Sequence, residues 1–115
     1  PMDRPARLKS HIIVSALLRR AGLAGAAAQV VRKGHADAGA IAVKVFIGRV
    51  DGVALARLFL PGHDEKGDAV WREPLDAAAP EDRIDALLEK ERRFDRDLWI
   101  IEIEDRMGRN FIGPD

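Results

Sequence analysis

Hydrophobic and polar residues alternate most regularly near the C-terminal end, in residues 98–105. One set of alternate residues is wholly apolar and the other becomes acidic toward its end: Trp99, Ile101 and Ile103, against Leu98, Ile100, Glu102 and Glu104. A period of two residues is typical of a β-strand with one buried face and one partly exposed face. Three large apolar side chains on one face have to be buried, so we expect this strand in the interior of a sheet.

Two other segments have the periodicity of amphipathic helices. The first covers residues 8–21 and is expected to end at Gly22 and Gly25. The second covers residues 80–94, where Pro80 suits the first helical position. The apolar positions of the second helix are Ile84, Leu87, Leu88 and Phe94.

Short apolar runs between the helices predict further strands. These runs are residues 28–32, 40–47, 53–60 and 69–73, with a last edge at 110–112. Asp51-Gly52 predicts a tight hairpin, and residues 61–67 predict a polar loop. Because the connections are short, we expect mostly antiparallel pairing. The order predicts an α+β fold over residues 1–115 as a single domain, with a mostly antiparallel sheet of four to six strands and two helices packed on one face.

Composition narrows the class of protein. A chain of 115 residues is the size of one domain, and it contains no cysteine. The lack of cysteine excludes disulfides and thiolate metal sites and is compatible with a reducing cytoplasm. The longest apolar run, around residues 12–14, is too short to span a bilayer. We therefore expect a cytoplasmic protein without a membrane partner.

The net charge of zero hides an asymmetry between the two halves of the sequence. Residues 1–50 contain nine Lys and Arg against two acids, a net charge of +7, and residues 51–115 carry −7. A basic half can indicate a nucleic-acid partner, here through Arg19, Arg20, Arg32 and Lys33. No aromatic residue is interleaved with them, so we favour halves that complement each other's charge.

Four charged residues form a candidate binding cluster: Asp37, Lys44, Glu102 and Glu104. If strands 40–47 and 98–105 are neighbours, Lys44 faces one of the two glutamates. Carboxylates at alternate strand positions lie about 7 Å apart and can share a cation. Metal-dependent nucleases, however, normally have an acid two residues before such a lysine, and this position is Ala42. An ion pair across two strands explains the same pattern.

The remaining motifs do not indicate a metal, phosphate-binding or catalytic site. His35 and Asp37 are candidate metal ligands by proximity alone, since no histidines have the spacing of a known metal motif. Neither phosphate-binding glycine motif occurs, and no serine lies in a nucleophile elbow. We expect neither a metal nor a cofactor, and no catalytic residue can be named.

Three segments, residues 15–20, 34–45 and 94–106, carry a resemblance to a known family. Their residues and spacing resemble a small, mostly alphaproteobacterial family catalogued as domain of unknown function fourteen ninety-one. The resemblance implies a cytoplasmic bacterial protein and brings no activity or catalytic residue with it.

Three functional hypotheses follow. The first is a non-enzymatic binding or assembly module, which includes the case of a homodimer, because the strands leave an edge for a second chain and no catalytic motif is intact. The second is a metal-dependent hydrolase or nuclease that uses the four-residue cluster. The third is nucleic-acid binding through the basic half, which we rank below a protein partner.

Overall fold

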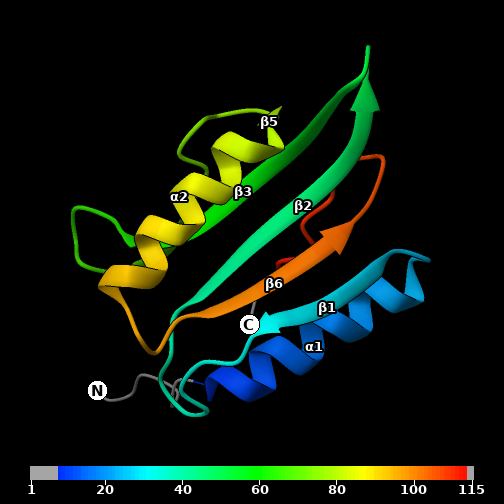
Figure 1. Cartoon of the computed structure of the whole chain (residues 1–115). Coiled ribbons are helices and arrows are strands. Elements are labelled where there is room, and N and C mark those ends of the chain that lie inside the picture. Colours follow the sequence, from blue (N-terminus) through cyan, green and yellow to red (C-terminus); the bar gives the residue numbers. More distant parts are fainter. Residues whose placement is uncertain (1–7, 114–115) are drawn as a thin grey trace.

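The computed structural model describes residues 8–113, which form two helices and six strands (Figure 1). In chain order the elements are α1 (Ser10–Leu23), β1 (Ala27–Arg32), β2 (Ile41–Val50), β3 (Val53–His63), β4 (Ala69–Arg72), β5 (Ala79–Pro80), α2 (Glu81–Phe94) and β6 (Trp99–Glu104). The predicted alternation of helices and strands is therefore confirmed, and the fold is α+β. No helix within the described part of the chain is long and apolar enough to cross a membrane.

The strands form one mixed sheet in the order β1-β6-β2-β3-β4, with β5 paired to β3. β6 lies between β1 and β2, as expected from its apolar face. Most pairs are antiparallel, but β2 and β6 are parallel, with Lys44 opposite Glu102. The parallel pair arises because α2 returns the chain to the end of the sheet where β2 begins.

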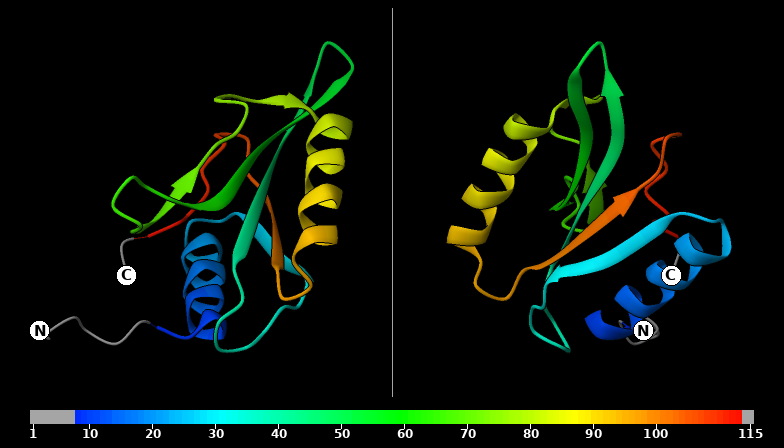
Figure 2. Two further views of the ribbon diagram at one scale, coloured as in Figure 1. Left: turned by 90° about the vertical axis from the view of Figure 1, so that its left-hand side faces the viewer. Right: turned by 45° about the vertical axis from the view of Figure 1, so that its right-hand side comes forward.

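The two helices lie on opposite faces of the sheet, so the expectation of a single helical face was wrong (Figure 2). Val14 and Leu17 of α1 pack with Ile101 and its alternate neighbours on β6. Ile84 of α2 packs in a second core that includes Ile100 on the other side of the same strand. The reason is visible in β6, whose first half is apolar on both sides and needs a cover on each.

Several boundaries differ from those predicted. α1 continues through Gly22 and ends beside Gly25, whose φ of +83° is the conformation that glycine favours. Residues 61–63 extend β3 and pair with β4, so only the turn after them is a loop. Phe94 is 81% exposed rather than part of the apolar stripe of α2. The Asp51-Gly52 hairpin is confirmed, with positive φ at both residues.

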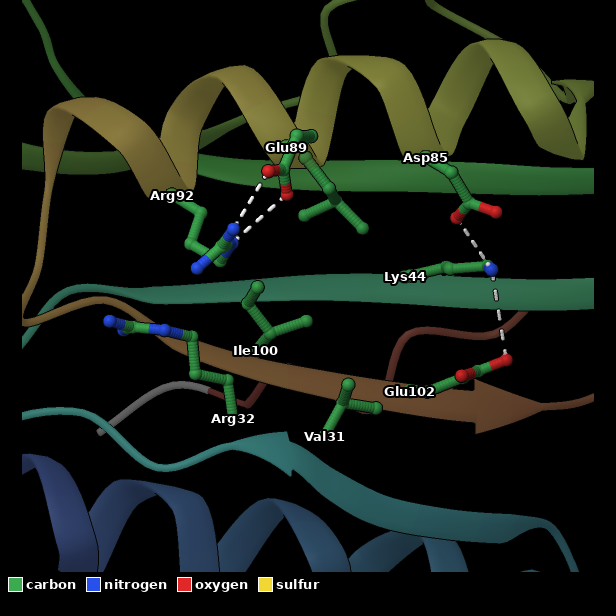
Figure 3. Close-up of a pocket in the computed structure, with 9 residues that line it drawn as sticks. Val31, Arg32, Lys44, Asp85, Glu89, Arg92, Ile100 and Glu102 are labelled. Carbon is green, nitrogen blue, oxygen red and sulfur yellow. Dashed lines mark hydrogen bonds and ion pairs between the residues drawn. The ribbon is translucent and has the colours of Figure 1, made fainter.

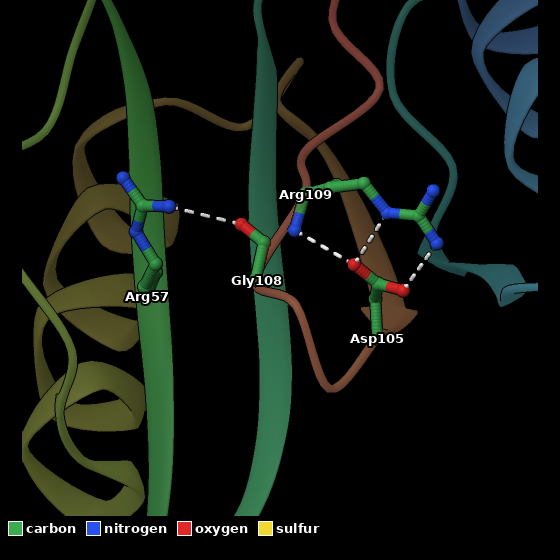
Figure 4. Close-up of polar contacts among 4 residues, drawn as sticks. All are labelled: Arg57, Asp105, Gly108 and Arg109. Atoms are coloured by element: carbon green, nitrogen blue, oxygen red, sulfur yellow. Dashed lines mark hydrogen bonds and ion pairs between the residues drawn. The ribbon is translucent and has the colours of Figure 1, made fainter.

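The C-terminal segment after β6 forms no strand, which corrects the edge predicted at 110–112. Its apolar residues Phe111 and Ile112 pack instead against the core on the α1 side. Polar contacts hold the turn before them (Figure 4): Asp105 accepts three hydrogen bonds from Arg109. Arg57 of β3 donates to the Gly108 carbonyl at 2.9 Å.

Candidate functional site

Lys44 is the one buried cation of the described chain, with an exposed fraction of 7%. It lies in the middle of β2, within an otherwise apolar run, and its side chain faces α2 (Figure 3). Its Nζ is 2.8 Å from Glu81 Oε2, 2.8 Å from Asp85 Oδ1 and 3.8 Å from Glu102 Oε2. Glu81 and Asp85 are four residues apart on α2, so both project from the same side of the helix toward the sheet.

The charges around Lys44 do not balance. Three carboxylates surround one ammonium group, which leaves a local net charge of −2. Burial acts to lower the pKa of Lys44, but hydrogen bonds to Asp85 and Glu81 and the nearby charge of Glu102 outweigh it. The pKa of Lys44 therefore lies above its ordinary value, and the group stays a cation rather than a base or nucleophile near neutral pH.

A groove of about 430 Å³ opens beside this cluster. α2 packs over β3, β2 and the first half of β6, and it leaves the neighbouring part of the same sheet face, around Glu102 of β6 and over β1, open (Figure 3). The residues that line the groove are Val31, Arg32, Lys44, Asp85, Leu88, Glu89, Arg92, Ile100 and Glu102. A second hollow of about 370 Å³ continues it, lined by Ala27, Ala28, Gln29, Glu102 and Glu104. Glu102 belongs to both, so the two hollows run along one side of β1.

β1 forms the outer border of this groove and is an edge strand. Among residues 8–113 it pairs with β6 alone, and its other edge has no strand beside it. Val30 and Val31 are 38% and 55% exposed, and Arg32 is the only charged residue of the strand. The register shifts between Val30 and Arg32, so that Val31 is an extra residue with no partner on β6.

The two ends of the groove differ in charge. Asp85 and Glu102 lie at the Lys44 end, and the guanidinium groups of Arg32 and Arg92 lie at the other (Figure 3). Arg92 forms two hydrogen bonds with Glu89. Arg32 donates instead to main-chain carbonyl oxygens, of Leu98 at 2.6 Å and of Arg96 at 2.9 Å.

The structure brings together two of the four residues in the predicted cluster. Lys44 and Glu102 are neighbours on adjacent strands. Glu104 lies two residues farther along β6, opposite Phe46, where it borders the second hollow. Asp37 lies at the other end of the sheet, in the loop before β2, with its carboxylate 3.9 Å from Lys9.

The loop that contains His35 and Asp37 has a structural explanation. The Nδ1 of His35 accepts hydrogen bonds from the main-chain N–H groups of Asp37 and Ala38. The main-chain N–H of His35 donates to the Asp97 carbonyl oxygen, and its carbonyl oxygen accepts from Trp99 Nε1. These hydrogen bonds account for the position of His35 within the loop, and they occupy its Nδ1.

These positions bear on the hydrolase hypothesis. A cation shared by Asp37 and Glu104 requires the two carboxylates to converge, whereas Asp37 lies in the loop before β2 and Glu104 at the far end of β6, which runs parallel to β2. Within residues 8–113, no group of three or more His, Asp or Glu side chains is placed to hold a metal ion. The four-residue metal site that this hypothesis needs is therefore not assembled.

Sequence reasoning missed Glu81 and Asp85, the two closest partners of Lys44. A signal was present: a lysine within an apolar strand needs an acid from the element packed above it. Two acids four residues apart at the start of a helix are suitable partners. The helix dipole is by itself a sufficient reason for an acid such as Glu81 in a first helical turn, so the pattern does not single out a partner for Lys44.

Comparisons with known proteins place this geometry in a family. A model described as "Protein of unknown function (DUF1491)" matches residues 8–113. The chain belongs to the DUF1491 family. Comparison with curated proteins gave no match.

Three solved structures resemble this DUF1491 chain over nearly its whole length. A crystal structure of a DUF1491 family protein from Caulobacter crescentus CB15 is 45% identical, covers 91% of this chain and 94% of its own, and has a TM-score of 0.79. An NMR structure of a DUF1491 family protein from the same organism is 44% identical, covers 94% of both chains and has a TM-score of 0.78. The solution structure of protein Atu0922 from A. tumefaciens is 37% identical, covers 93% of both and has a TM-score of 0.74. The family and fold are thereby established, and none of these descriptions gives an activity.

Proposed function

We propose that this DUF1491 protein is a non-enzymatic binding module that takes up an extended segment of a partner protein along the free edge of β1. The observation that carries the proposal is the unpaired outer edge of β1 beside a groove of about 430 Å³. An edge strand offers a row of main-chain donors and acceptors, which an added strand can pair with. The groove then provides space for alternate side chains of that strand.

The composition of β1 supports this role. Edge strands are commonly protected from pairing by lysine, proline or inward charges. β1 has no proline and one charge, Arg32, whose guanidinium is held by carbonyl oxygens at the end of the strand. Val30 and Val31 leave the middle of the edge apolar and open. The bulge at Val31 is the one protective feature that β1 has.

The alternatives have less support. Lys44, the only buried cation of the described chain, is held in its charged form by three acids and is unsuited to act as a base. For nucleic acid, two of the cations concerned are already engaged: Arg20 donates to the Phe111 carbonyl oxygen and Arg32 to those of Leu98 and Arg96. We also propose a cytoplasmic location, which the cysteine-free composition supports and cell fractionation tests.

A peptide selection tests the proposal while the natural partner is unidentified. A random library of ten-residue peptides is displayed on phage, selected against the folded protein, and the recovered peptides are measured one by one by calorimetry. We expect peptides with dissociation constants below about 100 μM, a free energy of about −5.5 kcal/mol. The same library selected against Val31→Lys is the comparison, because lysine protects an edge and position 31 is exposed enough to accept it.

The proposal stands if the peptides bind the native protein and lose at least tenfold in affinity on Val31→Lys. It fails if no peptide binds, or if the peptides bind both proteins equally, since the edge of β1 would then have no part in the interaction. Sedimentation of the protein alone shows whether it forms a dimer, and so distinguishes pairing with a second copy of this chain from pairing with a different protein. A dimer that dissociates on Val31→Lys would assign the edge to self-assembly.

A further inference from the structure

We propose, resting on the binding function above, that the segment bound at β1 is basic, with Lys or Arg at alternate positions whose side chains reach Glu102 and Glu104. The occupant is thus a cationic extended stretch of another protein. The inference starts from the surplus of negative charge on the open face of β6. It adds a chemical class of partner and a residue spacing to the proposed function.

The carboxylates concerned lie on the sheet face that β1 borders, and that of Glu102 leans toward Lys44 of β2. Gln29 of β1 lies opposite Glu102, and Ala27 lies opposite Glu104. Both pairs border the second hollow. A strand added outside β1 would lie two strand spacings from β6, about 9.5 Å. The four-carbon stem of lysine covers part of this distance over β1 and the glutamate side chain covers the rest, and the small side chain of Ala27 leaves the way to Glu104 open.

The charge of this region is unsatisfied. Lys44 is the only cation within 4 Å of Glu102 in the described chain, and it is shared with Glu81 and Asp85 at shorter distances. Glu104 is exposed, and no cation of residues 8–113 lies within salt-bridge distance of it. A partner cation placed here is attracted by at least two uncompensated negative charges.

The geometry also sets the spacing. Glu102 and Glu104 are alternate residues of β6, so their carboxylates lie on the same face about 7 Å apart. Side chains of an added strand repeat on that face with the same period. Two cations at positions i and i+2 therefore meet both glutamates, whereas two adjacent cations point to opposite faces of the sheet and only one meets the groove.

Three synthetic peptides of equal length test the proposal. The probe is Ac-Thr-Val-Lys-Val-Lys-Val-Thr-NH2, with lysines at alternate positions. The spacing control has the same composition and net charge but adjacent lysines, Ac-Thr-Val-Lys-Lys-Val-Val-Thr-NH2. The charge control replaces both lysines of the probe by glutamate. Binding to the native protein is measured by calorimetry at 50 and 200 mM salt.

We expect the alternate-lysine peptide to bind at least fivefold more tightly than the adjacent-lysine peptide and at least tenfold more tightly than the glutamate peptide. Its affinity should fall with salt. Glu104→Gln should weaken it about two- to fivefold, as an exposed ion pair does. Glu65→Gln is the matched control: it removes the same charge from the exposed turn after β3 and should leave the affinity unchanged.

The inference would be overturned by any one of three results: the alternate-lysine peptide binds no more tightly than the adjacent-lysine peptide, it binds no more tightly than the glutamate peptide, or its affinity is unchanged by Glu104→Gln. Failure of the proposed function is distinguishable from this. If the selected library peptides bind at β1 but are not basic, the binding function stands and the charge preference is wrong. If no library peptide binds either, the proposed function fails as well.

Discussion

The indole Nε1 of Trp99 donates a 2.8 Å hydrogen bond to the carbonyl oxygen of His35. The main-chain N–H of His35 in turn donates to the Asp97 carbonyl oxygen at 3.0 Å. These bonds tie the loop before β2 to the first residues of β6. Gly34 and Gly39 lie so close to the Asp97 carbonyl oxygen that a Cβ on either would overlap it. The Gly-rich loop is thus explained by packing against β6, an interior strand that contributes to the core on both faces of the sheet.

This contact predicts a large loss of stability for Gly39→Ala. The new Cβ would meet main-chain atoms of Asp97 and His35, which cannot move away cheaply. We expect the free energy of unfolding to fall by about 2–3 kcal/mol. Gly22→Ala is the control, since a Cβ there has no atom within 4 Å and lies in α1. Urea unfolding should show it unchanged or up to about 1 kcal/mol more stable. Similar losses in both variants would refute the packing explanation.

Replacing Lys44 by Met tests the buried charge cluster. The substitution keeps the apolar stem but leaves Glu81, Asp85 and Glu102 to repel one another. Since these acids are partly exposed, we expect a loss of about 1–3 kcal/mol at pH 7. Lys66→Met removes the same charge from an exposed turn and should change stability by less than about 0.5 kcal/mol. Unfolding in urea compares the two, and equal effects would contradict a specific role for Lys44.

The same variant predicts a dependence on alkaline pH. The pKa of Lys44 is higher in the folded chain than in the unfolded one, mainly because hydrogen bonds to Asp85 and Glu81 offset the effect of burial. Its contribution is therefore complete below the unfolded pKa of about 10.4 and is lost as the pH rises through the folded pKa. The stability difference between the native protein and Lys44→Met should be constant from pH 7 to 9 and smaller above pH 11. A difference that persists unchanged there would contradict this assignment.

Asp105 predicts the opposite behaviour in acid. Its hydrogen bonds from the Arg109 side chain, and further from the Arg109 main chain, lower the pKa of Asp105 despite some desolvation. A lowered pKa contributes stability above the unfolded value of about 3.9, and this is lost as the pH falls through the folded pKa. Asp105→Asn should cost about 1 kcal/mol at pH 7 and nothing once Asp105 is protonated. Asp51→Asn, which leaves an Asn-Gly turn, is the control. It should not change the free energy of unfolding either at pH 7 or in acid. Thermal melts across pH 2–7 measure the stability difference between the native protein and Asp105→Asn. A difference that stays constant over this pH range would contradict the role given to Asp105.

Sequence patterns predicted the fold well where one local signal decided the outcome. The alternation around Trp99 identified β6 and its interior position, and Asp51-Gly52 identified the hairpin. The helix periodicities located α1 and α2 within two residues at each end. The periodicities did not predict that α1 and α2 pack on opposite faces of the sheet. The apolar positions of a helix show that one of its faces is buried, but not which side of the sheet covers it.

The candidate site was predicted only in part, for a similar reason. The pairing of Lys44 with Glu102 follows from two strands that are both visible in the sequence. Glu81 and Asp85 join them only through the packing of α2 on β2, and the lysine in an apolar strand indicates that an acid is needed but not which helix supplies it. Asp37 was predicted in the same cluster, yet it lies in the loop before β2, and the parallel direction of β2 and β6 places it at the end opposite Glu104. Part of the charge of the basic half is compensated within the chain. Lys44 forms ion pairs with the acids around it, and Arg20 and Arg32 donate hydrogen bonds to main-chain carbonyl oxygens.

The central claim is that a partner strand pairs with the free edge of β1, and amide hydrogen exchange tests it most directly. The sheet has a second free edge, β4, which serves as an internal control. With the alternate-lysine peptide or the tightest selected peptide present at saturation, we predict slower exchange for amides of Ala27–Arg32 and unchanged exchange for Ala69–Arg72. Protection of β4, or exchange at β1 that stays as fast as in the free protein, would contradict the account.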